Sequence, residues 1–222
     1  MQQLTITVED DLSVSALAEA PAEARACLVL AHGAGAGMTH PFMTAVAAGL
    51  AARGFASLRY QFPYMEKGSK RPDRPPLAHA TVRTAVAAAA SRFAGLRLFA
   101  GGKSFGARMT SQAQALEPLP GVAGLVFLGF PLHPAGAPAH SRGDHLAQVG
   151  LPMLFLQGTQ DKLAEPMQLQ PVIASLGARA TLVRIDQADH SFHVPKRSGR
   201  DDAAVLEQLL DDVAAWMNGV LR

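Results

Sequence analysis

Residues 98–106, Leu-Phe-Ala-Gly-Gly-Lys-Ser-Phe-Gly, lead from an apolar run into a glycine-rich turn built around a single serine. The stretch from Gly102 to Gly106 fits the pattern Gly-x-Ser-x-Gly, which is typical of a nucleophilic serine at a sharp strand-to-helix turn. Such a turn holds the serine in a strained backbone conformation, and the flanking glycines let strand and helix approach without a Cβ clash. Because Gly and Ser also fill ordinary loops, the prediction that Ser104 is a nucleophile depends on partners elsewhere in the chain.

Strands and helices are predicted to alternate along the whole chain. Apolar runs bounded by turn residues predict strands at 4–8, 13–18, 27–31, 55–60, 96–100, 124–128, 152–157 and 181–185. Helical spacing of apolar residues predicts helices near 39–54, 77–93, 105–116, 165–176 and 205–220. Continuous apolar strands fit a parallel sheet that is covered on both faces. We therefore expect residues 1–222 to form a single α/β domain, with a mostly parallel central sheet and helices on both faces.

Three segments lack such periodicity. Residues 9–11 are expected to form a turn, and residues 61–76 a surface loop rich in proline and basic side chains. The basic residues of this loop either rim the site and favour an anionic substrate or simply form a solvated surface. Residues 129–150 are irregular apart from a short helix near 144–149, and they are too short and proline-rich for a large cap domain. Before the last helix, Ser198-x-x-Asp201 resembles a capping box.

Partners for Ser104 follow two of the later strands. Asp161 comes after the strand at 152–157, and His190 comes after the strand at 181–185. In open parallel sheets, ligands and chemistry lie beyond the carboxyl ends of the strands. A serine, an acid and a histidine in this chain order can form a nucleophile, the acid that orients the base, and the base itself. Each residue alone has an ordinary structural use, but their joint order and placement predict a catalytic triad.

The histidine and the acid each have an alternative nearby. His193 is the alternative base, but we prefer His190 because it follows the strand sooner. Asp189 is a weak candidate for the acid, because a residue adjoining His190 does not easily fold back onto its Nδ1 atom.

A glycine-rich loop is predicted to supply the oxyanion hole. Residues 32–37, His-Gly-Ala-Gly-Ala-Gly, follow the strand at 27–31. The backbone N–H groups of Ala34 and Phe105 are the expected donors, and the amide of Phe105 also opens a helix whose dipole helps. By position alone, the expected walls of the substrate pocket are His32, Met43, Phe130 and His133.

Other chemistries fit the sequence less well. Gly102-Lys103-Ser104 matches the end of a phosphate-binding loop, but Arg97 stands where the first glycine of that motif belongs. The glycines at 33–37 also lack the spacing of a dinucleotide fingerprint. His190 and His193 have no matching metal ligands nearby in the sequence, so neither metal nor cofactor is expected. Lys103 is assigned no catalytic role.

Composition restricts the partners. Lys and Arg together number 20 and Asp and Glu 18, a balance that gives no reason to expect nucleic acid or an anionic membrane as a partner. No apolar stretch is long enough to span a bilayer, and no signal peptide is visible at the start. The single cysteine, Cys27, suits a reducing cytoplasm. We expect a cytoplasmic monomer or homodimer that acts on a small-molecule substrate.

Five segments together resemble a known family. They are 32–43 (HGAGAGMTHPFM), 101–109 (GGKSFGARM), 129–134 (GFPLHP), 156–161 (LQGTQD) and 189–193 (DHSFH). They look like the dienelactone-hydrolase-like α/β-hydrolases, and more narrowly like the branch typified by testis-expressed protein 30, over about residues 26–220. The resemblance implies an α/β-hydrolase fold with little or no cap.

The resemblance also bears on function. Dienelactone hydrolases usually carry a cysteine nucleophile, so Ser104 speaks against lactone specificity and favours ordinary ester chemistry. The expected activity is hydrolysis of a small ester, thioester or lactone through an acyl-enzyme. Relatives of this branch include a scaffold-like subunit of a histone acetyltransferase complex. The alternative expectation is therefore a non-catalytic protein-binding module on the same fold.

Overall fold

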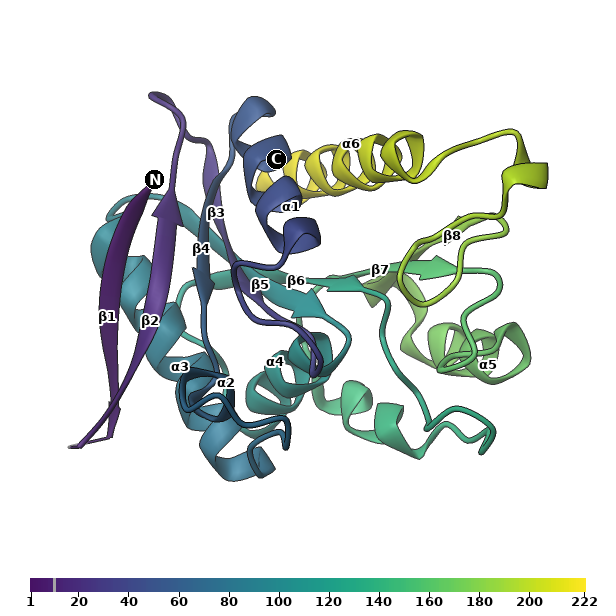
Figure 1. The fold of residues 1–222 in the computed structure, drawn as a ribbon, viewed down its shortest axis with the longest axis horizontal. Coiled ribbons are helices and arrows are strands. Elements are labelled where there is room, and N and C mark those ends of the chain that lie inside the picture. Colours follow the sequence, from purple (N-terminus) through teal and green to yellow (C-terminus); the bar gives the residue numbers. More distant parts are fainter. Residues whose placement is uncertain (10) are drawn as a thin grey trace.

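Eight strands form one sheet in this computed structural model, which describes residues 1–9 and 11–222 (Figure 1). The strands are β1 (Gln2–Glu9), β2 (Leu12–Glu19), β3 (Ala26–Ala31), β4 (Ala56–Tyr60), β5 (Arg97–Lys103), β6 (Val122–Leu128), β7 (Met153–Gly158) and β8 (Ala180–Ile185). Their order in the sheet is β1-β2-β4-β3-β5-β6-β7-β8. The pairs β1–β2 and β2–β4 are antiparallel, and all later pairs are parallel. The expected mostly parallel sheet is confirmed.

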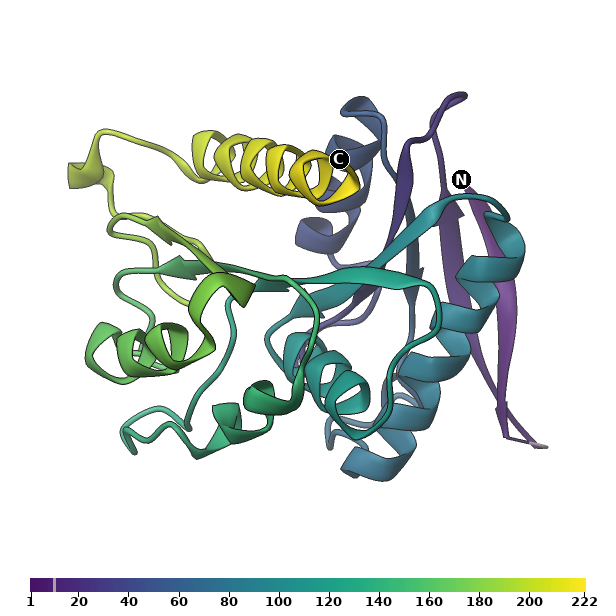
Figure 2. The ribbon, with the colours of Figure 1, turned by 180° about the vertical axis from the view of Figure 1, so that it is seen from behind.

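Helices cover both faces of this sheet (Figures 1 and 2). One face carries α1 (Pro41–Ala52) and α6 (Asp202–Leu221), and the other carries α3 (Pro75–Arg92), α4 (Phe105–Leu116) and α5 (Pro166–Leu176). The connections contain the short helix α2 (Pro63–Glu66) and the 3₁₀ helices η1 (Ser141–Gln148), η2 (Gly177–Arg179) and η3 (Lys196–Ser198). The two apolar layers between helices and sheet hold the fold together, because burial of apolar surface is the main stabilising term.

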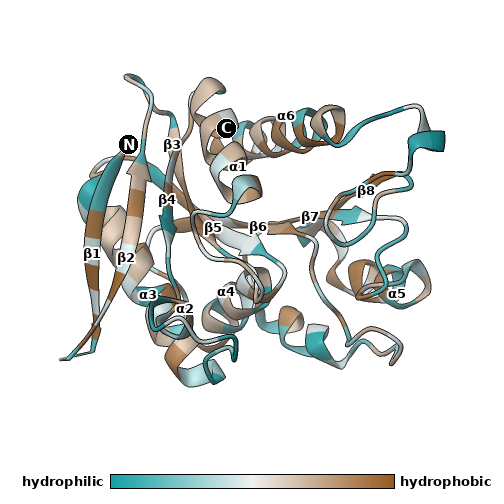
Figure 3. Cartoon of the chain, in the orientation of Figure 1, coloured by the Kyte–Doolittle hydropathy of each residue, from teal (hydrophilic) through white to brown (hydrophobic). Residues whose placement is uncertain are grey.

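The central strands are apolar on both faces because both faces are covered (Figure 3). Every residue of β3 and of β7 is buried. In β1, at the edge, Ile6 is the one fully buried residue and its neighbours alternate toward solvent. This difference in pattern identifies β3, β5, β6 and β7 as the buried central strands of the sheet. Their carboxyl ends are therefore well fixed positions for the residues of a site.

One local expectation holds only in part and another was wrong. The segment 61–76 is a surface loop only between α2 and α3, because Phe62 and Tyr64 are buried, α2 forms within it, and α3 already begins at Pro75. The capping box does not form. Ser198 lies in η3, and Asp201 is the N-cap of α6, where its carboxylate accepts a hydrogen bond from the Ala204 N–H at 2.8 Å.

Residues 129–150 contain only η1, so the structure has no large cap domain. The turn expected at 9–11 includes Asp10, which lies outside the described residues. None of the helices found in residues 1–9 and 11–222 is long and apolar enough to cross a membrane.

Candidate active site

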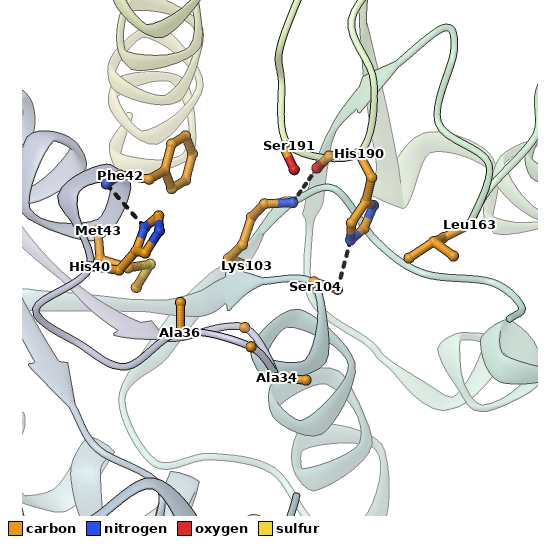
Figure 4. A pocket seen from close by; sticks show the side chains of 12 residues that line it. Ala34, Ala36, His40, Phe42, Met43, Lys103, Ser104, Leu163, His190 and Ser191 are labelled. Atoms are coloured by element: carbon orange, nitrogen blue, oxygen red, sulfur yellow. Dashed lines mark hydrogen bonds between the residues drawn. The ribbon is translucent and has the colours of Figure 1, made fainter. Parts of the chain in front are cut away.

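Ser104 occupies the single residue between β5 and α4. Its backbone has φ 52° and ψ −109°, in the positive-φ region that non-glycine residues rarely adopt. The tight turn brings α4 directly against the end of β3. A Cβ at Gly106 would lie 2.6 Å from the carbonyl oxygens of both Ala31 and His32, so only glycine fits there. The turn directs the Ser104 side chain into the space above the carboxyl ends of the strands (Figure 4).

The structure brings Ser104, His190 and Asp161 together from three separate loops. The Ser104 Oγ atom lies 2.8 Å from His190 Nε2 (Figure 4), and His190 Nδ1 lies 2.6 Å from Asp161 Oδ2. A carboxylate can only accept, so Nδ1 carries the proton that is donated to Asp161. The Nε2 atom of the neutral ring is then left to accept from the serine hydroxyl. The three side chains form a hydrogen-bonded relay with the direction that a general base requires.

Asp161 is held by two further donors. Its side chain is fully buried, its Oδ1 accepts from the Leu163 N–H at 2.8 Å, and its Oδ2 also accepts from the Gln157 side-chain amide. The Oε1 atom of Gln157 accepts from the Phe130 N–H at 2.9 Å, which fixes the orientation of the amide. Sequence reasoning missed Gln157, although a polar side chain at the end of an otherwise apolar strand was a signal that it has a partner.

His32 and Tyr64 hold the glycine-rich loop after β3 in place through hydrogen bonds to its carbonyl groups. The Gly33 carbonyl lies 2.7 Å from His32 Nδ1, and the Tyr64 hydroxyl donates to the carbonyls of Gly33 at 3.3 Å and Ala34 at 2.9 Å. In a trans peptide the C=O and N–H point in opposite directions. The Ala34 N–H therefore points away from these hydrogen bonds, and Ala34 itself lines the pocket.

The second expected donor, the Phe105 N–H, directly follows Ser104 in the chain. Phe105 is the first residue of α4, so its N–H belongs to the first turn and has no acceptor within the helix. The positive end of the helix dipole also lies here. The two expected donors are therefore the Ala34 N–H in the glycine-rich loop and the Phe105 N–H at the start of α4.

The His32 ring is neutral and fixed in one tautomer. Its Nε2 accepts a hydrogen bond from the Phe62 N–H at 3.0 Å, so Nδ1 is the protonated atom that donates to Gly33. Burial of this ring lowers its pKa to about 4. His32 was expected to be a wall of the pocket. It is instead a buried residue that supports the glycine-rich loop.

A pocket of about 290 Å³ opens beside Ser104 and His190 (Figure 4). Its lining comes from the glycine-rich loop, the start of α1, the turn that carries Ser104, and the loops after β7 and β8. Besides Ser104 and His190, the side chains that line it are Ala34, Ala36, His40, Phe42, Met43, Lys103, Leu163 and Ser191. Met43 is thus the one expected wall residue that lines it.

Phe130 and His133 do not line this pocket, contrary to expectation. Both are fully buried, because the chain after β6 turns inward and is hydrogen-bonded to the loop after β7. The Leu163 carbonyl accepts from the N–H of Leu132 at 2.8 Å and from that of His133 at 3.1 Å. Phe130 packs instead in an aromatic cluster with Phe127 and Phe155.

The two alternative triad members have other partners. His193 is exposed and its Nδ1 lies 2.8 Å from Asp202 Oδ2 at the start of α6. The Asp189 carboxylate accepts from the N–H groups of Ser191 and His193, so it shapes the loop that carries His190 rather than contacting the imidazole.

The basic residues of the 61–76 segment do not contribute to the pocket. Lys67, Lys70, Arg71 and Arg74 are all exposed and none lines the pocket beside Ser104. Within the described part of the chain, no cluster of three or more His, Cys, Asp or Glu side chains is arranged to hold a metal ion.

The mostly parallel sheet covered by helices on both faces, with a serine in a strained turn between β5 and α4, is typical of an α/β-hydrolase. Comparison with known protein families gives the same class. A family described as an alpha/beta hydrolase domain matches residues 24–218. The chain therefore belongs to this family. The narrower resemblance to the testis-expressed protein 30 branch stays a prediction.

Solved structures with the same fold include a dienelactone hydrolase and members of the alpha/beta serine hydrolases, one of which is described as having no lid. A dienelactone hydrolase from Anabaena variabilis has a TM-score of 0.79 and 20% identity, and the match covers 100% of this chain and 99% of that one. An alpha-beta serine hydrolase homologue from Coxiella burnetii has a TM-score of 0.76 and 19% identity, covering 95% and 96%. A serine hydrolase without lid from Xanthomonas campestris has a TM-score of 0.74 and 19% identity, covering 97% and 94%. At these identities the likeness is one of fold.

Proposed function

We propose that this protein is a serine hydrolase that cleaves a small ester, thioester or lactone through an acyl-enzyme. The observation that carries the proposal is the unbroken hydrogen-bond relay from Ser104 through His190 to Asp161, with Ser104 in a strained turn at the edge of a pocket. Strained backbone at a polar residue costs free energy and usually persists where function requires it.

In the proposed reaction, Ser104 Oγ attacks the acyl carbonyl while His190 Nε2 takes its proton. His190 then protonates the leaving alcohol, thiol or ring oxygen, and the acyl group remains bonded to Ser104. A water molecule attacks this acyl-enzyme while His190 Nε2 takes one of its protons. The bond between the acyl carbon and Ser104 Oγ then breaks, His190 returns the proton to Ser104 Oγ, and the carboxylic acid is released. Asp161 keeps Nδ1 protonated and stabilises the imidazolium that forms in each step.

The N–H groups of Ala34 and Phe105 are proposed to stabilise the negative charge that develops on the carbonyl oxygen. Such donors are effective because they are fixed before the reaction begins. The hydrogen bonds to the Gly33 and Ala34 carbonyls and the start of α4 support this assignment, because both amides belong to rigid elements.

The pocket supports a small substrate. Its volume of about 290 Å³ lies at the lower end of the range for ligand pockets, roughly 300–1,000 Å³. With no large cap, the acyl or leaving group can also extend toward solvent. We further propose a cytoplasmic monomer or homodimer, in keeping with the single Cys27, which is buried.

Kinetics of substituted enzymes test the proposal. With 4-nitrophenyl acetate as substrate, we expect Ser104→Ala to lower kcat by up to about 10⁶-fold and Asp161→Asn by about 10⁴-fold. His193→Ala is the matched control, since this exposed histidine is bonded to Asp202, and it should keep the parental rate. If Ser104→Ala hydrolyses the ester as fast as the parent, or if His193→Ala is as inactive as His190→Ala, the assignment is wrong.

A folded parent protein that hydrolyses none of a panel of short- and long-chain esters, thioesters and lactones would favour the alternative, a protein-binding module without catalysis.

A further inference from the structure

Lys103 stands directly before Ser104 and its side chain crosses the pocket (Figure 4). The stem passes the glycine-rich loop, where a Cβ at Gly33 would lie 3.6 Å from Lys103 Cγ. The ammonium ends beside Gly129, where a Cβ would lie only 2.9 Å from Nζ and 3.5 Å from His190 Cε1. The absence of a side chain at Gly129 therefore leaves the room in which the ammonium sits, next to the edge of the His190 ring.

This ammonium has few partners within the protein. It donates to the His190 carbonyl, and it lies 5.1 Å from the centre of the Phe192 ring. Throughout the described chain, no Asp or Glu oxygen lies within 4.0 Å of Lys103 Nζ. An ammonium has three N–H donors, so two are free of any acceptor from the described residues. A partly buried cation without a counter-ion is a costly arrangement unless something else neutralises it.

Among the described residues, no other side chain that lines the pocket can form an ion pair with Lys103, and the carboxylates of Asp161 and Asp189 act on the ammonium only from beyond ion-pair distance. The other side chains of the pocket are mostly apolar, with Phe42, Met43 and Leu163 as the largest, and its polar members besides Ser104 and His190 are His40 and Ser191. No carboxylate lines it among the residues that the structure describes. A single cation in an apolar pocket attracts an anionic ligand group more strongly than it would in open water.

We propose that Lys103 forms an anion subsite beside Ser104, so that the preferred substrates are esters or thioesters that carry a carboxylate. This inference rests on the proposed serine-hydrolase function. A carboxylate on the substrate would accept the two free N–H donors of the ammonium while its scissile carbonyl lies at Ser104 Oγ. Specificity would then come from the variable position of the Gly-x-Ser-x-Gly turn itself. The exposed basic residues of the 61–76 segment have no part in it.

Two matched substrate pairs test the inference. One pair places the charge on the acyl side: mono-4-nitrophenyl adipate against its methyl-capped diester. The other pair places it on the leaving group: 3-carboxy-4-nitrophenyl butyrate against 4-nitrophenyl butyrate. In each pair the measured quantity is the ratio of kcat/KM for the anionic member to that for the neutral member. A hydrogen bond to a charged group should raise this ratio by about 10- to 100-fold in at least one pair.

Substitutions at Lys103 test whether this residue causes the preference for anionic over neutral substrates. Lys103→Met removes the charge and keeps most of the stem, and the ratio should fall to near one. Lys103→Arg keeps the charge and should retain most of the preference. Lys162→Met is the control for long-range attraction, since Lys162 is exposed, adjoins Asp161 and does not line the pocket. It should leave the ratio of the parent unchanged.

A pH profile of the parent provides a test that needs no variant. Burial lowers the pKa of Lys103 from 10.5 to about 8, against the opposing pull of Asp161 and Asp189. The other titratable groups facing it are His190 and, across the pocket, His40. Because kcat/KM reports groups of the free enzyme, the anionic-to-neutral ratio should fall as the pH rises through about 8, where the ammonium loses its proton.

The two proposals fail in different ways. If the parent cleaves the neutral esters but shows no anionic preference in either pair, the subsite is wrong and the hydrolase stands. A preference that survives Lys103→Met, disappears equally in Lys162→Met, or stays constant between pH 7 and 9 also overturns the subsite. If the folded parent cleaves none of the four esters and also takes up no fluorophosphonate probe, the proposed function itself fails.

Discussion

His32 is the residue whose part in the site differs most from its expected one. It was expected as a wall of the pocket, but it is fully buried and fixes the peptide group that contains the Ala34 N–H. The position of a histidine next to a glycine-rich loop is visible in the sequence. Whether its ring turns outward or inward depends on Phe62 and Tyr64, which come from a segment that lacks helical periodicity.

Replacement of His32 tests this support. In His32→Leu the Gly33 carbonyl loses its imidazole donor, so the Ala34 N–H should be less well fixed. We expect kcat to fall by about 10- to 100-fold with KM little changed, somewhat less than the loss of a whole oxyanion donor. His32→Asn, with a donor near the position of Nδ1, should recover part of the rate.

His133→Leu is the matched control for His32→Leu. His133 is equally buried and its Nδ1 lies 2.9 Å from the Pro134 carbonyl, but it lies outside the pocket. Its replacement should lower the melting temperature with kcat retained. If both variants lose kcat in proportion to lost stability, His32 has no role beyond the core.

The helices and strands themselves were largely predictable. The continuous apolar runs of β3 and β7 and the amphipathic spacing of α6 reflect burial that the sheet requires. The ends of elements were less predictable, because a cap is decided by which side chain meets a free backbone N–H. The capping box expected from Ser198 and Asp201 does not form at α6, because Ser198 lies in the 3₁₀ turn η3 and Asp201 itself is the N-cap.

The cap assignment has a measurable consequence for stability. Asp201→Ala removes the acceptor for the Ala204 N–H and should lower the free energy of unfolding by about 1 kcal/mol. Ser198→Ala removes only the local hydrogen bonds between Ser198 Oγ and the Arg200 backbone and should cost less, roughly 0.5 kcal/mol. Urea unfolding followed by circular dichroism measures both. A larger loss in Ser198→Ala than in Asp201→Ala would restore the capping box.

The site is a property of the whole molecule. Ser104, Asp161 and His190 are distant in sequence and meet because β5, β7 and β8 run parallel and end at one edge of the sheet. This convergence was predictable from the sequence, because in open parallel sheets the residues that follow the carboxyl ends of the strands lie together. The pocket walls were not, because they depend on how long loops pack. The carbonyl of Leu163, for example, draws the chain at 132–133 inward and buries His133.

The same convergence makes the reactivity of Ser104 depend on the fold. In the unfolded chain Ser104 is an ordinary serine, whose hydroxyl is a weak nucleophile without an adjacent base. In the folded chain it donates to His190, and Ser191, the other serine that lines the pocket, has no such partner among the hydrogen bonds of the described residues.

The most direct test of the central claim is mass spectrometry of the protein after reaction with a fluorophosphonate probe. We predict one covalent adduct per folded chain, on the peptide that contains Ser104, with slower labelling in Asp161→Asn and none in urea. A folded protein that takes up no probe, or that carries the adduct on Ser191 instead, would contradict the account.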